Sequence, residues 1–163
     1  MKVAATLVVL LIAPGPVAAQ ALKPFVKGTW TTLRQAHHGQ PLIVHFWGLT
    51  CPPCLGELPH WGELVKEHRG VPVIFVAADP ISVERDQIER TLASAGLQHE
   101  DRWVFGSEFV DPLRWEVSPD WAGELPLTLL IDKSGTTTTI VGVANLAAVR
   151  AWIAKQAPRS PGR

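Results

Sequence analysis

The sequence contains little cysteine, no net charge and no internal repeat. Only two cysteines occur in 163 residues, so the chain can form at most one intramolecular disulfide. The 15 basic and 15 acidic residues cancel, which gives none of the basic surface that is typical of a nucleic-acid-binding protein. With 47% hydrophobic and 18% charged residues, the chain has the size and composition of a single globular domain.

The one long apolar run lies near the start of the sequence and is too short for a comfortable membrane span. Lys2 precedes a mostly apolar run over residues 3–13, whereas a span needs about 20 apolar residues. A Pro-Gly-Pro break and small residues then follow. This layout predicts a signal peptide over residues 1–20, with an uncleaved N-terminal anchor as the alternative. No cysteine directly follows the segment, so we expect no lipoprotein anchor.

Residues 23–156 are expected to form one domain, with a disordered tail over residues 157–163. Apolar, β-prone runs predict strands at 42–47, 71–78, 103–105, 127–131 and 136–143. Amphipathic or capped stretches predict helices at 31–38, 51–68 with a kink at Pro59, 82–95, 109–115 and 145–155. This alternation, closed by a hairpin and a helix, predicts an α/β three-layer sandwich with a mixed central sheet flanked by helices.

Both cysteines fall within one stretch, FWGLTCPPCLGELP, at residues 46–59. A structural disulfide gains most when it closes a long loop, whereas Cys51 and Cys54 would enclose only two residues. An exported protein can nevertheless keep such a bond, because the compartment is oxidising. A disulfide between these two cysteines would stabilise the fold little, so their spacing favours a reactive role over a structural one.

The position of Cys51 at a predicted helix start favours thiol–disulfide exchange. A buried strand and a short loop lead to Cys51 as the N-cap, and Pro52 follows at the first helical position, where proline is well tolerated. A helix N-terminus can lower a thiol pKa from about 8.5 to about 3.5–7.5, and the thiolate is the attacking species. Cys54 lies one turn later on the same side, so it can resolve a mixed disulfide.

The two prolines between the cysteines limit this stabilisation of the thiolate. Pro52 and Pro53 have no amide hydrogen, which leaves the N–H of Cys54 as the nearest donor to the Cys51 sulfur. We therefore expect a weaker thiolate stabilisation than a glycine in this pair would give. The consequence is a less oxidising redox couple.

Metal binding is the alternative use of two thiols at this spacing. A structural zinc site would need histidine ligands, but no second C-x-x-C and no close histidine pair of zinc spacing follows. His60 falls on roughly the opposite helix face from the cysteines. Capture of Cu(I) by Cys51, Cys54 and a histidine stays open, because soft thiolates suit this ion. A copper chaperone is therefore the alternative function.

Three blocks of the sequence resemble the TlpA/ResA/CcmG-like group of exported bacterial thiol–disulfide oxidoreductases, which have a thioredoxin-like fold. The first block is VHFWGLTCPPCLGELP, the second is VPVIFVAAD, and the third is LPLTLLIDKSG. Their order and spacing cover most of residues 28–156. C-x-x-C alone is a weak signal, but it becomes specific when the distant proline block and the N-terminal segment accompany it.

The resemblance implies a periplasmic enzyme that reduces protein disulfides, as in cytochrome c maturation. Cys51 would attack the substrate and Cys54 would resolve the mixed disulfide. The Cys51–Cys54 disulfide would be the redox centre, with no other cofactor and no metal. The implied partners are protein disulfide substrates and a thiol-reducing electron donor in the membrane. We expect a monomer, and a disulfide oxidase is the alternative direction of the reaction.

The resemblance also implies a substrate-binding surface around Cys51. Pro126 would be a cis proline whose loop, with Leu125, lies against the Cys51 sulfur and binds the substrate backbone. Pro52, Pro53 and Trp47 are the other expected contacts. Trp121 precedes the loop and is a further candidate for lining a peptide groove.

Two titratable residues near the cysteines are candidates for proton transfer. Glu57 lies three residues after Cys54 on the same helix face and matches the acidic residue of the family. It is either a proton acceptor for the resolving thiol or a solvated glutamate. His45 stands six residues before Cys51, where the family often has an asparagine. It is either a proton relay or, in the slightly favoured interpretation, a strand histidine that bonds a backbone carbonyl.

Overall fold

The computed structural model describes residues 21–80, 82 and 85–156 of the chain. The six strands of its sheet are β1 (Lys23–Phe25), β2 (Leu42–Trp47), β3 (Val73–Ala77), β4 (Asp101–Phe105), β5 (Leu127–Ile131) and β6 (Thr137–Val141). The five helices are α1 (Thr29–Ala36), α2 (Pro52–Glu67), α3 (Arg85–Ser94), α4 (Asp111–Val117) and α5 (Leu146–Gln156).

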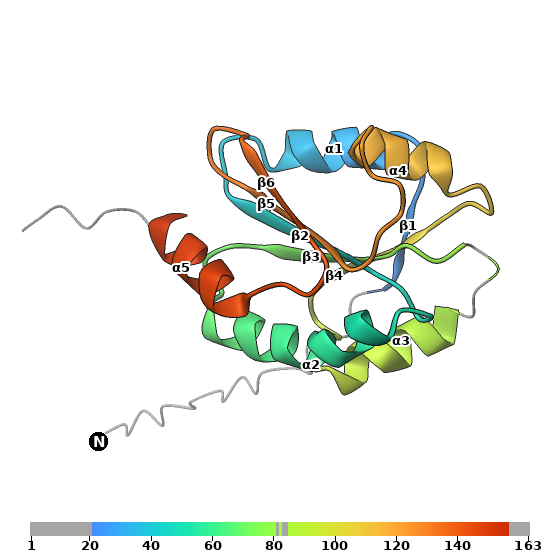
Figure 1. The fold of residues 1–163 in the computed structure, drawn as a ribbon, viewed down its shortest axis with the longest axis horizontal. Coiled ribbons are helices and arrows are strands. Elements are labelled where there is room, and N and C mark those ends of the chain that lie inside the picture. The colour runs from blue at the N-terminus through green and yellow to red at the C-terminus, as the bar shows by residue number, and fades with distance from the viewer. Residues whose placement is uncertain (1–20, 81, 83–84, 157–163) are drawn as a thin grey trace, which may run out of the picture.

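The strands form one mixed sheet in the order β1-β4-β3-β2-β5-β6. β1, β4, β3 and β2 are parallel to one another, whereas β5 runs antiparallel to β2 and β6 antiparallel to β5. Helices α1 and α4 cover one face of the sheet, and α2, α3 and α5 cover the other (Figure 1). The predicted three-layer α/β sandwich with a mixed central sheet is therefore confirmed.

Each face of the sheet has its own hydrophobic core, because the central strands are buried on both sides. On the α2 side, Trp61 and Leu58 of α2 pack with residues of β3, α3 and α5. On the α1 and α4 side, Phe46 packs with Phe25, Phe105 and residues of both helices. Residues from β2 thus contribute to both cores, and the loop that carries Cys51 follows the end of this central strand.

The predicted central elements are confirmed, whereas the edges of the sheet differ. β2 and β5 coincide with the predicted strands, and Asn145 caps α5 by accepting hydrogen bonds from the N–H groups of Ala147 and Ala148. β1 was not predicted, because three residues that include Pro24 carry no strand pattern. The ends of the other elements lie within three residues of the predicted ends.

Three predictions concern residues outside the described part of the chain. The signal peptide at 1–20, the disordered tail at 157–163 and the first turn of the helix predicted at 82–95 fall wholly or partly there. Within residues 21–80, 82 and 85–156, no helix has the length and hydropathy needed to cross a membrane. Pro59, the expected kink point, lies inside α2, which is continuous from Pro52 to Glu67.

Candidate functional site

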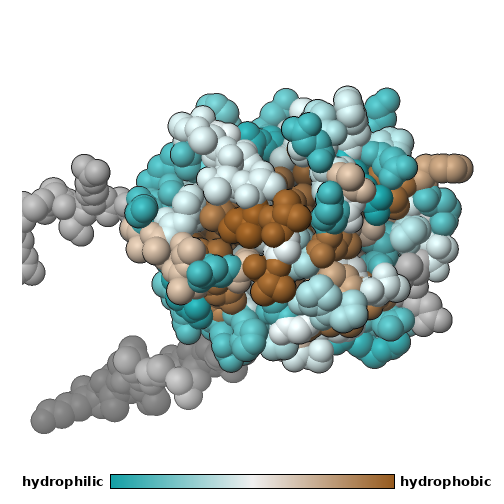
Figure 2. Space-filling model, in the orientation of Figure 1, coloured by the Kyte–Doolittle hydropathy of each residue, from teal (hydrophilic) through white to brown (hydrophobic). Residues whose placement is uncertain are grey.

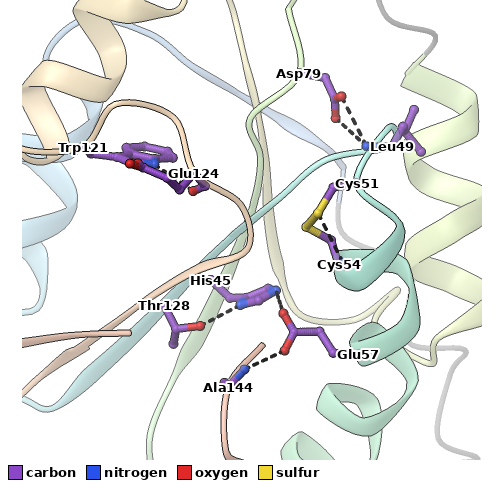
Figure 3. The surroundings of a disulfide bond; sticks show 10 residues. All are labelled: His45, Leu49, Cys51, Cys54, Glu57, Asp79, Trp121, Glu124, Thr128 and Ala144. Carbon is purple, nitrogen blue, oxygen red and sulfur yellow. Dashed lines mark hydrogen bonds and ion pairs between the residues drawn. A yellow bond between two sulfur atoms is a disulfide. The ribbon is translucent and has the colours of Figure 1, made fainter. Parts of the chain in front are cut away.

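Cys51 and Cys54 form a disulfide at the N-terminus of α2, with an S–S distance of 2.08 Å and a Cα–Cα distance of 5.2 Å (Figure 3). The two sulfur atoms differ in access. Cys51 is half-buried, whereas the side chain of Cys54 is fully buried. Of the two cysteines, only Cys51 is therefore exposed to solvent in this structure.

The N-cap geometry predicted for Cys51 is confirmed. Its sulfur accepts a hydrogen bond from the N–H of Cys54 at 3.3 Å, and prolines occupy the first two helical positions. The backbone N–H of Cys51 donates to the carbonyl of Gly48 at 3.2 Å, which closes a turn between β2 and α2. A thiolate at Cys51 would thus face one backbone donor and the positive end of the helix.

The Leu125–Pro126 peptide bond is cis, as predicted. Its turn leads into β5, whose first residue Leu127 pairs with Phe46 of β2. Leu125 reaches the loop that carries Cys51, because its Cδ1 lies 3.2 Å from the position that a Cβ on Gly48 would take. The turn and the cysteine loop are therefore neighbours at the same end of the sheet.

The expected substrate-contact residues differ in their exposure. Pro52 and Pro53 are exposed, Leu125 is half-buried and Pro126 is buried. The expectation that Trp47 contacts substrate is wrong for this conformation, because the side chain is fully buried in the core. Trp121 likewise packs on Phe46 at a ring distance of 4.8 Å and is only 7% exposed, so it does not line a groove.

Trp121 instead lies in the core and forms a hydrogen bond to the backbone just before the cis-proline turn. Its indole Nε1–H donates to the backbone carbonyl of Glu124 at 2.9 Å, directly before Leu125 (Figure 3). Because Trp121 also packs against Phe105 in the core, this bond ties the turn to the rigid sheet. Trp121 therefore contacts the turn through the backbone of Glu124.

An apolar surface lies next to the cis-proline turn. The N–H of Gly142 donates to the carbonyl of Pro126 at 2.8 Å, and Val141 pairs with Leu127 across the β5–β6 hairpin. Val141 is 61% and Val143 60% exposed, although both side chains are apolar. Figure 2 shows apolar side chains gathered near the centre of this face, over the end of β6 and the segment that follows it.

Below the disulfide, a buried row of polar groups connects two strands, one helix and the segment before α5. The Nδ1 atom of His45 lies 3.0 Å from the hydroxyl of Thr128, and Nε2 faces Oε1 of Glu57 at 3.4 Å (Figure 3). The other carboxylate oxygen of Glu57 accepts the N–H of Ala144 at 3.1 Å. The row therefore extends from β5 through β2 and α2 to the segment before α5.

Burial sets the charge state of this row. His45 is fully buried, which lowers its pKa to about 3, so the imidazole is neutral at physiological pH. Burial also raises the pKa of Glu57, although the hydrogen bond from Ala144 opposes this shift. A neutral imidazole offers one donor and one acceptor, so it can accommodate Glu57 in either protonation state by changing tautomer.

Two interpretations made from the sequence are wrong at this row. His45 does not bond a backbone carbonyl, because its partners are the side chains of Thr128 and Glu57. Glu57 is not a solvated helix glutamate, because it is only 4% exposed. Cys54 and Glu57 both face inward from α2, one turn apart, so the carboxylate lies on the side of the resolving sulfur (Figure 3).

Asp79 is a residue of the site that the sequence reasoning missed. It follows β3, is 6% exposed, and accepts the N–H of Leu49 with both carboxylate oxygens at 3.0 and 3.2 Å. Burial raises its pKa. In the sequence, Asp79 stands at the end of the predicted strand 71–78. If that strand is assumed to run parallel to the strand that leads to C-x-x-C, the two strand ends meet at one edge of the sheet, and Asp79 becomes a candidate for the site.

Metal binding finds no support in the described residues. Within residues 21–80, 82 and 85–156, no group of three or more His, Cys, Asp and Glu side chains is arranged to hold a metal ion. His60 is exposed and faces Glu63 at 3.6 Å instead of the cysteines. The copper-chaperone alternative therefore lacks a third ligand in this part of the chain.

The sequence model of the AhpC/TSA family matches residues 15–154, which is most of the chain. The chain belongs to the AhpC/TSA family. Two curated relatives are thiol-disulfide oxidoreductases named ResA. The protein from Halalkalibacterium halodurans is 30% identical over 99 residues, which are 60% of this chain and 51% of the relative. The protein from Bacillus thuringiensis is 25% identical over 123 residues, which are 74% of this chain and 65% of the relative.

The chain thus spans between half and two thirds of the length of these curated relatives. Among solved structures, a secreted Mycobacterium tuberculosis disulfide oxidoreductase homologous to E. coli DsbE superposes with a TM-score of 0.60. It is 15% identical, and the match covers 74% of this chain and 85% of the other. StoA from Bacillus subtilis gives a TM-score of 0.54 at 22% identity, with 71% and 83% covered. These similarities confirm the predicted thioredoxin-like fold.

Proposed function

We propose that this member of the AhpC/TSA family is a thiol–disulfide oxidoreductase that reduces disulfides in exported proteins. The observation that carries the proposal is the Cys51–Cys54 disulfide at the N-terminus of α2, with one sulfur accessible and the other buried. A clasp across two residues would add little stability. The same arrangement gives an attacking thiol and a resolving thiol.

The reaction moves two electrons from the protein to its substrate. In the reduced protein, the Cys51 thiolate attacks one sulfur of a substrate disulfide, and the other substrate sulfur leaves as a thiolate. Cys54 then attacks the Cys51 sulfur of the mixed disulfide. This step releases the second substrate thiolate and restores the Cys51–Cys54 disulfide. A thiol-reducing donor in the membrane is proposed to return the two electrons.

Glu57 is proposed to take the proton that Cys54 must lose before it attacks. The carboxylate and the sulfur leave the same side of α2, and both are buried. When Glu57 is ionised, Nε2–H of His45 can face Oε1 while Nδ1 accepts the Thr128 hydroxyl proton. When Glu57 is protonated, the other imidazole tautomer accepts its proton at Nε2. His45 thus supports proton uptake without becoming charged.

The surface around Cys51 is proposed to bind an unfolded or extended segment of the substrate protein. Pro52 and Pro53 are exposed beside the attacking sulfur, and the Leu125–Pro126 turn lies against the cysteine loop. The exposed Val141 and Val143 extend this uncharged surface along the hairpin. Such a surface suits the apolar side chains that an unfolded protein exposes.

The electrostatics of the site favour the reductase over the oxidase direction. A strongly oxidising couple requires a well-stabilised thiolate in the reduced protein. Here, one backbone N–H faces the Cys51 sulfur, because its two following residues are prolines. The buried carboxylates of Glu57 and Asp79 oppose a further negative charge at this end of the sheet. Both features make the dithiol easier to oxidise, and hence a better reductant.

The proposed place of action is the periplasm. Residues 1–20 have the layout of an export signal. Proteins with disulfides, the proposed substrates, occur in oxidising compartments such as the periplasm. Two of the structural neighbours are described as secreted proteins, one from Mycobacterium tuberculosis and one from Corynebacterium glutamicum. Because the only cysteines form the redox centre, no structural disulfide competes with the reaction in the same chain.

Reduction of insulin tests the proposed activity. In the presence of dithiothreitol, the protein is expected to speed the precipitation of the insulin B chain above the rate with dithiothreitol alone. Bovine serum albumin with blocked thiols is a suitable control for any non-specific effect of added protein on the precipitation rate. If the rate equals that of dithiothreitol alone at every protein concentration, the proposed function is wrong.

Glu57→Gln is expected to slow the resolving step by about a hundredfold at neutral pH, because a positioned base contributes at least about that factor. The glutamine side chain would keep an oxygen for the N–H of Ala144 but could not accept the Cys54 proton. In the wild type, the rate should fall as pH falls through the Glu57 pKa, which burial raises above 4.5. The measurement is the decay of the mixed disulfide after rapid mixing, as a function of pH.

Stability measurements separate this effect from unfolding. Because the folded-state pKa of Glu57 is raised, the ionised side chain costs stability above that pKa. Glu57→Gln should therefore become more stable relative to the wild type as pH rises from 4.5 through the folded pKa. A variant that resolves the mixed disulfide as fast as the wild type at every pH would rule out Glu57 as the acceptor.

A further inference from the structure

We propose that Asp79 is a positioning residue, whose buried carboxylate anchors the loop that carries Cys51 against the Leu125–Pro126 turn. The inference deepens the proposed function and rests on it, because the position of the loop matters for exchange only if Cys51 attacks. Asp79 does not contact the substrate in this account. It acts through the backbone of the loop.

The bond from Leu49 to Asp79 extends the hydrogen-bonded ladder between β2 and β3 beyond the ends of the two strands. β2 ends at Trp47, and the N–H of Ala78 still donates to the carbonyl of Trp47 at 2.8 Å. Beyond that point, the N–H of Leu49 donates to the side chain of Asp79 instead of to a backbone carbonyl. The residue after Asp79 is Pro80, which has no N–H to extend the ladder. The carboxylate thus replaces a backbone partner where the chain turns toward Cys51.

Gly48 is close to both the Asp79 anchor and the cis-proline turn. A Cβ at Gly48 would lie 3.3 Å from Oδ1 of Asp79 and 3.2 Å from Cδ1 of Leu125. The carbonyl of the same glycine accepts the N–H of Cys51 at 3.2 Å. Asp79 and Leu125 therefore both lie close to the residue whose carbonyl binds the Cys51 backbone, at the place where a Cβ of Gly48 would project. Displacement of Asp79 would loosen Cys51 relative to the turn.

The carboxylate is costly to bury at this position, which argues for a specific role. Asp79 is only 6% exposed, and burial raises its pKa. Among the residues that the structure describes, no lysine, arginine or histidine forms an ion pair with it. Its partner is the backbone N–H of Leu49, and an ionised acceptor makes such a bond shorter and stronger (Figure 3).

Two variants of equal charge and similar size isolate the anchoring bond. Asp79→Asn and Asp79→Leu both remove the negative charge, but only asparagine can accept the N–H of Leu49. Comparison of these two variants with each other therefore excludes the direct effect of the charge on the Cys51 thiol. Each variant is studied as the full domain in its reduced state, and its thermal unfolding is recorded first.

The first readout is the pH dependence of alkylation of Cys51 by iodoacetamide, followed by peptide mapping. We expect a higher Cys51 thiol pKa in Asp79→Leu than in Asp79→Asn, because a loosened loop moves the sulfur away from the N–H of Cys54. The second readout is insulin reduction, which should be at least about tenfold slower in Asp79→Leu, since misplacement of about 1 Å can cost more. Equal thiol pKa values and equal rates in the two variants would overturn the proposal.

A measurement on the wild type covers the case in which Asp79→Leu does not fold. Hydrogen exchange followed by NMR should show the Leu49 amide at least about a hundredfold slower than in an unstructured peptide of the same sequence. Exchange at the unprotected rate would mean that the anchor is absent in solution. If the wild type failed to reduce insulin at all, the proposed function would fail, but the alkylation and exchange results would still decide the anchor.

Discussion

Cys51→Ser is expected to lower the rate of insulin reduction to that of dithiothreitol alone. Cys54→Ser is expected to stop the reaction one step later, after the mixed disulfide has formed. Only Cys51 is accessible, because Cys54 is fully buried behind it. The variant that keeps Cys51 can still attack a substrate disulfide, but no second thiol displaces the product. Cys54→Ser should therefore accumulate a mixed disulfide, which non-reducing electrophoresis and mass spectrometry detect.

The two serine variants control for each other. Both remove the same disulfide, which closes a separation of three residues, so any loss of stability should be similar in the two proteins. A difference in trapping between them then reports chemistry and not folding. The assigned roles would be contradicted if Cys51→Ser trapped the substrate while Cys54→Ser did not, because the two sulfurs would then act in the reverse order.

Gly62→Ala is expected to lower the free energy of unfolding by about 3 kcal/mol, at the upper end of the usual cost of overpacking. Gly62 lies on the buried side of α2, where a Cβ would come within 1.8 Å of the carbonyl oxygen of Ala95. The contacted atom belongs to the backbone at the end of α3, which cannot rotate away as a side chain could. Thermal or chemical unfolding of the oxidised protein, followed by circular dichroism, measures the change.

Gly56→Ala is the matched control in the same helix. A Cβ at this exposed position would have no neighbour within 4 Å, so alanine should stabilise the protein by about 0.5–1 kcal/mol through its better helix propensity. Opposite signs for these two Gly→Ala changes in one helix would show that α2 and α3 pack as described. A Gly62→Ala variant as stable as the wild type would mean that the helices are further apart in solution.

The central elements of the fold could be predicted from the sequence because their patterns are strong. The runs at Leu42–Trp47 and Leu127–Ile131 are continuous and mostly apolar, and they form the strands β2 and β5. Cys51 and the following prolines marked the start of α2 in the same way. β1 has only three residues, and its place is set by pairing with β4, which a local pattern does not reveal.

The partners of the site residues depend on contacts between distant segments. Thr128 and Ala144 meet His45 and Glu57 across separations of 83 and 87 residues, so no local pattern predicted the row. Asp79 was missed for the same reason, since its bond to Leu49 exists only because β2 and β3 are neighbours. Trp47 was expected at the surface because it is close to Cys51 in sequence, but β2 is covered on both faces, so a side chain on either face enters a core.

The reduction potential of the Cys51–Cys54 couple tests the central claim most directly. Equilibration of the protein with defined glutathione buffers, followed by alkylation and mass measurement, gives the potential. We predict reversible two-electron behaviour at or below about −200 mV, closer to thioredoxin at about −270 mV than to strongly oxidising relatives at about −120 mV. A disulfide that does not equilibrate with glutathione, or a potential near the oxidising limit, would contradict a working reductase at this site.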